Sequence, residues 1–101
     1  EINYFAYSLA TIEFHNELYG YLQEKNTAYR QHDIENVFSV HSFGRNKKWI
    51  RINTDGSLQD EMVTLPTYIR NIIHHPENTN NSQYTYEELQ NSIELMLNLI
   101  R

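Results

Sequence analysis

The sequence predicts a mostly α-helical fold: an antiparallel helical bundle with a short extended or hairpin insertion near residues 48–54. Two long segments support this, because their apolar residues recur at steps of three and four, the spacing of a helix with one buried face. A third helical segment is bounded by two prolines. The length of 101 residues suits one domain, residues 1–101, with a single core.

The first predicted helix runs from residue 2 to about residue 25. Gly20 weakens it by about 1 kcal/mol relative to alanine. A polar loop, residues 26–32, follows it. The apolar face of this helix is expected to consist of Ile2, Phe5, Leu9, Ile12, Leu18 and Leu22.

A short helix is expected after this loop. Asp33 would be its N-cap, because an aspartate side chain accepts hydrogen bonds from the free backbone N–H groups of a first turn. Ile34, Val37 and Phe38 would be its buried positions.

Residues 48–54 have strand character, because tryptophan and isoleucine favour extended backbone. The Asp55-Gly56 pair that follows is a turn signal. The segment is therefore either one half of a small hairpin or an extended loop lying on the helices. Ser57 and Asp60, three residues apart, resemble a weak helix start.

Two further helices complete the predicted fold. The first has Pro66 in its opening turn and ends at Pro76, since proline cannot continue a helix. The second starts at a capping box, in which Thr85 and Glu88 each bond a free backbone N–H of the other. Its buried face is expected to consist of Leu89, Ile93, Met96, Leu97 and Ile100.

The composition narrows the class of protein. The formal net charge of -5 argues against a general nucleic-acid coat, which is usually basic. The chain has no cysteine, which excludes disulfides and thiolate metal sites and agrees with a reducing cytoplasm. No apolar run approaches the ~20 residues that span a bilayer. The chain begins with Glu1 rather than methionine, so we expect a domain cut from a longer protein.

A local basic segment stands out against this acidic background. Such a segment can hold phosphate at one place, and its tryptophan either stacks on an unpaired base or packs into the core. We favour packing for Trp49 and RNA binding for the lysines. The basic residues fall within seven positions: Arg45, Lys47, Lys48 and Arg51.

The end of the third predicted helix combines an arginine, an asparagine and two histidines. Arg70 and His74 lie about 40° apart on one helix face, and Asn71 and His75 are paired on the next. Pro76 biases His75 out of helical geometry, so its ring could swing towards Arg70. An arginine grips phosphate and histidines move protons near neutral pH, which is the minimum set for metal-independent RNA cleavage.

Two other interpretations of these residues stay open. Positive side chains in a last helical turn meet the negative end of the helix dipole, and Arg70 could pair with Glu77 or another acid. A metal site is a further reading, because His74, His75 and Glu77 are close in sequence. Adjacent histidines point to different faces, however, and no metal-binding motif is present. We therefore expect neither a metal nor a cofactor.

The pattern of Arg70, Asn71 and His75 resembles the Arg-x4–6-His signature of the HEPN superfamily, in which a polar residue, often asparagine, directly follows the arginine. This resemblance implies a small helical bundle and a metal-independent endoribonuclease of the toxin or anti-phage (antiviral defence) type. It also implies a homodimer in which two signatures form one composite site. More loosely, residues 65–78 and 84–93 look like the C-terminal end of some AAA-type or ABC-type ATPases of bacterial defence systems.

The resemblance also implies a role for each residue of the signature. Arg70 would stabilise the phosphate, His75 would be the acid or base, and Asn71 would orient them. His74 remains a rival to His75, because ideal helix geometry places it beside Arg70.

We therefore expect a cytoplasmic endoribonuclease that cleaves single-stranded RNA or tRNA as a homodimer. The alternative is a non-catalytic helical assembly module at the C-terminus of an ATPase domain in the same polypeptide. In that alternative, tyrosine-rich and apolar faces mediate assembly and Arg70 is structural.

Overall fold

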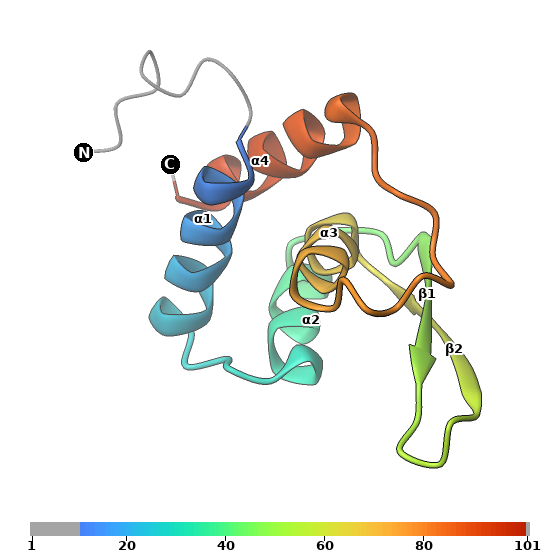
Figure 1. Ribbon diagram of the computed structural model, residues 1–101. Coiled ribbons are helices and arrows are strands. Elements are labelled where there is room, and N and C mark those ends of the chain that lie inside the picture. Colours follow the sequence, from blue (N-terminus) through green and yellow to red (C-terminus); the bar gives the residue numbers. More distant parts are fainter. Residues whose placement is uncertain (1–10, 101) are drawn as a thin grey trace.

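The computed structural model describes residues 11–100, and these form helices and one small antiparallel sheet (Figure 1). The mostly α-helical class is confirmed. The predicted positions Ile2, Phe5 and Leu9 lie outside the described residues. The elements are α1 (Ile12–Lys25), α2 (Gln31–Val40), β1 (Lys47–Ile52), β2 (Leu58–Val63), α3 (Leu65–His74) and α4 (Tyr86–Ile100).

One hydrophobic core joins the helices. Helix α1 packs against both α3 and α4, and α2 adds Phe38, whose ring stacks on Phe43 with centroids 5.0 Å apart. No helix formed by residues 11–100 has both the length and the apolar character that a bilayer-spanning segment requires. The core side chains of the helices are Phe14, Leu18, Tyr19, Leu22, Ile34, Phe38, Ile69, Leu89, Ile93, Met96 and Leu97.

The buried face of α1 differs in part from the predicted one. Leu18 and Leu22 are buried as expected, but Ile12 is 45% exposed. Phe14 and Tyr19 complete the face instead. Ile12 is the first residue of the helix, directly after the N-cap Thr11, whose side chain accepts the N–H of Phe14 at 3.0 Å.

Helix α2 starts three residues before the position that the sequence suggests. Its N-cap is Arg30, so the prediction that Asp33 caps it is wrong. Asp33 lies inside the first turn, where its carboxylate meets the positive end of the helix dipole. Aspartate is favoured both at the N-cap and in the first turn of a helix, so the sequence pattern did not show which of these two positions Asp33 occupies. Ile34 and Phe38 are buried, as predicted.

The predicted segment at residues 48–54 overlaps β1 (Lys47–Ile52), which is one half of a hairpin, so the loop alternative is wrong. The antiparallel strands pair Lys47 with Val63 through to Ile52 with Leu58. The predicted helix start at Ser57 is also wrong. There the Asp55 carboxylate accepts both the N–H and the hydroxyl of Ser57, at 2.9 and 2.6 Å, and so closes the hairpin turn. Gly56 supplies the positive φ of 89° that this turn needs.

The hairpin is attached to α3 by a second small core. Trp49 is only 4% exposed and packs edge-on against Tyr68, with ring centroids 6.0 Å apart. Val63 is buried beside them. Trp49 therefore packs into the protein, as favoured above, and its ring is not free to stack on a base.

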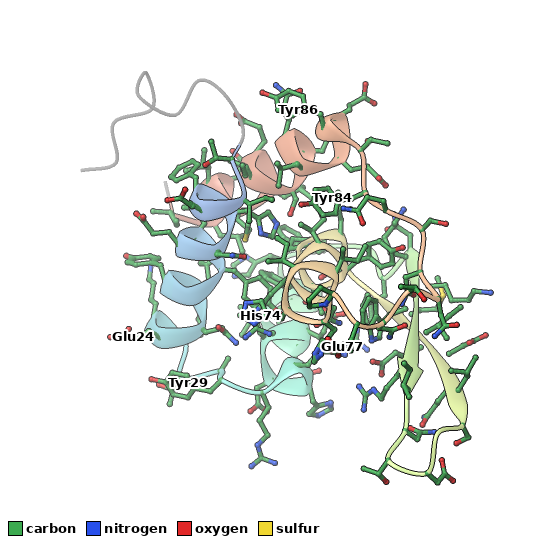
Figure 2. All side chains as sticks on the ribbon, viewed as in Figure 1. Glu24, Tyr29, His74, Glu77, Tyr84 and Tyr86 are labelled. Atoms are coloured by element: carbon green, nitrogen blue, oxygen red, sulfur yellow. The ribbon has the colours of Figure 1, made fainter. Side chains whose placement is uncertain are left out.

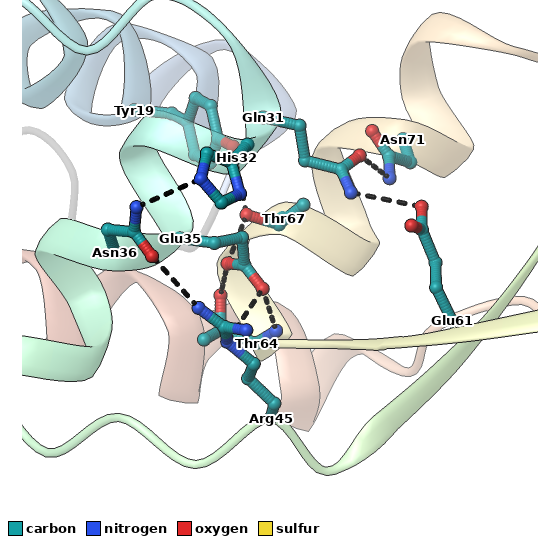
Figure 3. Close-up of polar contacts among 10 residues, drawn as sticks. All are labelled: Tyr19, Gln31, His32, Glu35, Asn36, Arg45, Glu61, Thr64, Thr67 and Asn71. Atoms are coloured by element: carbon teal, nitrogen blue, oxygen red, sulfur yellow. Dashed lines mark hydrogen bonds and ion pairs between the residues drawn. The ribbon is translucent and has the colours of Figure 1, made fainter.

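The start of α3 is held by a buried carboxylate from α2. Glu35 is 4% exposed and accepts three hydrogen bonds, from the N–H of Thr64 at 2.9 Å and from the hydroxyls of Thr64 and Thr67 at 2.5 and 2.8 Å. The Thr67 hydroxyl donates its only proton to Glu35. The phenol of Tyr19, whose oxygen lies 2.9 Å from the Thr67 hydroxyl oxygen, therefore donates to Thr67. Glu35 caps α3 in place of a side chain of the helix itself (Figure 3).

Replacing Glu35→Gln is expected to lower the free energy of unfolding by about 2–3 kcal/mol, because an amide cannot accept all three bonds and brings unmatched donors into a buried site. Urea unfolding followed by circular dichroism measures this loss. Glu24→Gln, an exposed change on α1, is the control and should cost less than about 0.5 kcal/mol. Equal losses for the two variants would contradict the capping role.

A histidine is buried between α1 and α4. His15 is fully buried, and its Nε2 lies 2.7 Å from the hydroxyl oxygen of Ser92. Its Nδ1 is buried with no hydrogen-bond partner among the residues that the structure describes. Burial lowers the pKa of His15 from 6.5 to about 4. The folded protein therefore holds His15 neutral at neutral pH.

This burial predicts a loss of stability in mild acid. Between pH 6.5 and about 4 the unfolded chain binds a proton that folded His15 does not, so the free energy of unfolding should fall as the pH falls through this window. The expected total is about 3 kcal/mol. His15→Gln should remove this contribution, whereas exposed His41→Gln should leave it. Parallel urea titrations across the window test this, and an unchanged slope in His15→Gln would contradict it.

Candidate functional site

The end of α3 forms as the sequence predicts. The helix runs from Leu65 to His74, and the N–H of His75 still donates to the carbonyl of Asn71 at 3.0 Å. His75 itself is the C-cap, with φ -128° and ψ 62°, because Pro76 disfavours helical backbone at the preceding residue. His75 thus leaves the helix direction while His74 stays on it.

Arg70 and His74 lie together on the side of α3 that faces α1. The guanidinium carbon of Arg70 is 5.0 Å from the centroid of the Tyr19 ring. No carboxylate of residues 11–100 lies within ion-pair distance of Arg70. Partial burial, and then the charges of Arg70 and His75, lower the pKa of His74 below its ordinary value. An arginine without an acidic partner therefore sits beside an imidazole that is neutral at neutral pH.

Asn71 and His75 turn towards the hairpin instead. Asn71 is 4% exposed, and its amide donates to the side-chain oxygen of Gln31 at 3.0 Å. Gln31 in turn donates to Glu61 at 3.0 Å (Figure 3). The ring of His75 is exposed, with Nδ1 3.3 Å from a carboxylate oxygen of Glu77. Figure 2 shows His74 and Glu77 on opposite sides of the end of α3.

Within one chain, the predicted catalytic residues therefore divide between two faces. Asn71 and His75 line a surface hollow of about 270 Å³ together with Arg51 and Trp49. Arg70 and His74 do not line it. A single chain does not place Arg70 and His75 around one phosphate in this hollow, and His74 is the histidine beside Arg70.

The predicted RNA-binding cations are each engaged with a carboxylate. Arg51 meets Glu61 at 2.6 Å, and Lys47 meets Glu88 at 2.7 Å. The Lys47 hydrogen bond is the main reason that the pKa of Glu88 is lowered. The two remaining pairs are looser, at 3.9 Å each: Arg45 with Glu35 and Lys48 with Asp60. Lys47 and Lys48 line a separate hollow of about 240 Å³.

The asparagine-rich loop before α4 contributes residues that the sequence did not single out. Asn78 and Asn81 both donate to the carbonyl of Ile50, at 2.8 and 3.0 Å, and the side-chain oxygen of Asn81 accepts the N–H of Ile50 at 2.7 Å. Asn78 also lines the hollow of His75 and a neighbouring hollow of about 470 Å³. The run of asparagines in the sequence could have drawn attention to this loop. The sequence did not show that the loop bonds to β1.

The structure also bears on which ligands this site could hold. Among residues 11–100, no three histidine or acidic side chains lie close enough to share a metal ion. In comparisons with known proteins, no family model, no curated protein and no solved structure matched this chain. The candidate site is thus described by its own residues: an arginine beside His74, and a polar hollow beside His75.

The two neighbouring residues Arg70 and Asn71 should differ in their effect on stability. Asn71→Ala is expected to cost about 1–2 kcal/mol, because it removes a buried hydrogen bond and leaves the side-chain oxygen of Gln31 without this donor. Arg70→Ala should cost less than about 1 kcal/mol, since it removes only a partly exposed cation–π contact. Urea unfolding of both variants measures the order. A larger loss for Arg70→Ala would show that Arg70 is a structural residue.

Proposed function

We propose that this chain is a metal-independent endoribonuclease acting on single-stranded RNA or tRNA. The observation that carries the proposal is the pairing of Arg70, which has no acidic partner in residues 11–100, with His74, whose pKa is lowered. A cation whose charge is not neutralised can bind a phosphate, and a neutral imidazole next to it can accept a proton. The four cations of the basic segment, Arg45, Lys47, Lys48 and Arg51, already meet carboxylates, and Arg70 differs from them in this respect.

The proposed reaction uses groups at the end of α3. His74, neutral at neutral pH, removes the proton of a ribose 2′-hydroxyl, and the oxygen attacks the adjacent phosphorus. The bond from phosphorus to the 5′-oxygen breaks, and His75, acting as the general acid, donates a proton to that oxygen. The products are a 2′,3′-cyclic phosphate and a 5′-hydroxyl. Arg70 stabilises the negative charge that develops on the phosphate oxygens.

A homodimer belongs to this proposal. Arg70 and His75 belong to two faces of one chain, so a composite site formed by two chains would let the His75 of one copy serve the Arg70 of the other. The resemblance to HEPN ribonucleases supports such a composite site, together with the antiparallel bundle, a cytoplasmic setting and a defence-type role. Lys47 and Lys48 would bind RNA beyond the cleaved bond, exchanging their carboxylate partners for phosphates.

A second candidate is the assembly module of an ATPase. It is favoured by the buried hydrogen bond of Asn71 and by the packing of Arg70 on Tyr19, both of which have purely structural explanations. In this candidate the polar residues of α3 only position the helix, and no RNA is cleaved.

Cleavage of labelled single-stranded RNA and tRNA in EDTA tests the proposal. Arg70→Ala, His74→Ala and His75→Ala are each expected to lower the cleavage rate by about 100-fold or more, because acid–base and charge-stabilising groups contribute at least this much. His41→Ala, an exposed histidine on another element, is the control and should cleave normally. Circular dichroism confirms that each variant is folded.

The outcomes separate the two candidates. Cleavage that survives EDTA and is lost in the Arg70 and histidine variants would support the nuclease. Loss in His74→Ala but not in His75→Ala would assign the essential imidazole to His74 alone. Absence of cleavage by folded protein at high concentration would favour the assembly module.

A further inference from the structure

The two edges of the hairpin differ in how their backbone groups are satisfied. In an antiparallel pair, alternate residues turn their N–H and C=O groups away from the partner strand. On β1 the outward groups of Ile50 are fully bonded by the side chains of Asn78 and Asn81. The loop before α4 thus covers the middle of the outer edge of β1, at Ile50.

The outer edge of β2 has no such cover. The N–H of Asn53 donates to the carbonyl of Ser57 at 2.8 Å, and alternation from this pair turns the backbone groups of Leu58, Asp60 and Met62 outward. These groups have no hydrogen-bond partner within the part of the chain that the structure describes. Figure 1 shows no helix or strand beside β2 on that side. Such an edge is a template for another strand.

Two of the three outward residues of this edge are exposed and apolar. Leu58 is 56% exposed and Met62 is 50% exposed. Both lie on the sheet face that points away from Trp49, with Asp60 between them. Lys48, on the neighbouring strand, lies 3.9 Å from the Asp60 carboxylate.

We propose that β2 pairs with β2 of a second copy of this chain, antiparallel and with the two-fold axis at Asp60. In this register Leu58 lies opposite Met62 of the second copy, and Met62 opposite its Leu58. Each of the three outward residues exchanges both of its backbone hydrogen bonds with the second copy. The result is one continuous sheet that includes both hairpins.

Symmetry is the reason that a second copy suits this edge. The order apolar, acidic, apolar reads the same in both directions, so only this register places apolar on apolar at both ends. The two Asp60 side chains face each other at the centre, which weakens association. Each brings its own Lys48, so the central cluster of four charges is neutral. The proposal concerns association alone and does not depend on RNA cleavage.

Sedimentation velocity across a concentration series tests this pairing. Leu58→Glu should weaken the dimer about tenfold or more, because it removes two apolar cross-strand pairs and adds charge beside Asp60. Ile52→Glu is the matched control: Ile52 is opposite Leu58 and 44% exposed, but it lies on the covered strand. It should leave the dimer intact. Asp60→Asn should tighten the dimer about fivefold by removing the repulsion.

Hydrogen exchange provides a second measurement on the unmodified chain. The amides of Leu58, Asp60 and Met62 should exchange quickly when dilute and become protected as the concentration rises. The amides of Gln59 and Glu61, which bond to β1, should not change. A chain that stays monomeric at about 1 mM would overturn the proposal. So would a dimer that resists Leu58→Glu and Met62→Glu, or one without concentration-dependent protection. Each result stands whether or not RNA is cleaved.

Discussion

The buried carboxylate of Glu35 is the interaction on which the arrangement of this protein depends. It lies at the N-terminus of α3, where unpaired N–H groups and the helix dipole favour a negative charge. Thr64 and Thr67 bond to it, and Tyr19 bonds to Thr67, so one carboxylate links α1, α2 and α3. Because the exit of the hairpin and the start of α3 are adjacent in sequence, Glu35 also sets where the hairpin leaves the helical body.

A second chain of polar contacts holds the other end of α3. Asn71 bonds to Gln31, Gln31 to Glu61, and Arg51 to Glu61, which ties α3 to α2 and to both strands. With α3 held at both ends, the residues of its last turn project from a rigid element. Arg70 faces α1 and His75 faces the hairpin, because Asn71 is tethered to Gln31 and because His75, which precedes Pro76, leaves the helix direction.

The cations of the basic segment are neutralised locally. The basic segment of Arg45, Lys47, Lys48 and Arg51 is distributed over a loop and a strand, so its members point to different acids instead of forming one positive surface. An acidic chain offers many carboxylates, and each of these four cations meets one nearby. Arg70 differs from these four because it packs on the aromatic ring of Tyr19, with its guanidinium carbon 5.0 Å from the ring centroid.

The sequence by itself determined the features that depend on near neighbours. Pro76 ended α3, the reciprocal bonds of Thr85 and Glu88 started α4, and Asp55-Gly56 turned the hairpin, because each involves groups only a few residues apart. Helical spacing also identified Leu18, Leu22, Ile93 and Met96 as core. Two predictions, that Asp33 caps α2 and that a helix starts at Ser57, were wrong. Asp33, Ser57 and Asp60 each suit more than one local structure. Only the tertiary structure decided which acid each cation meets, which ring lies under Arg70, and that Glu35 is buried. Those partners lie tens of residues apart in the chain, and packing alone brings them together.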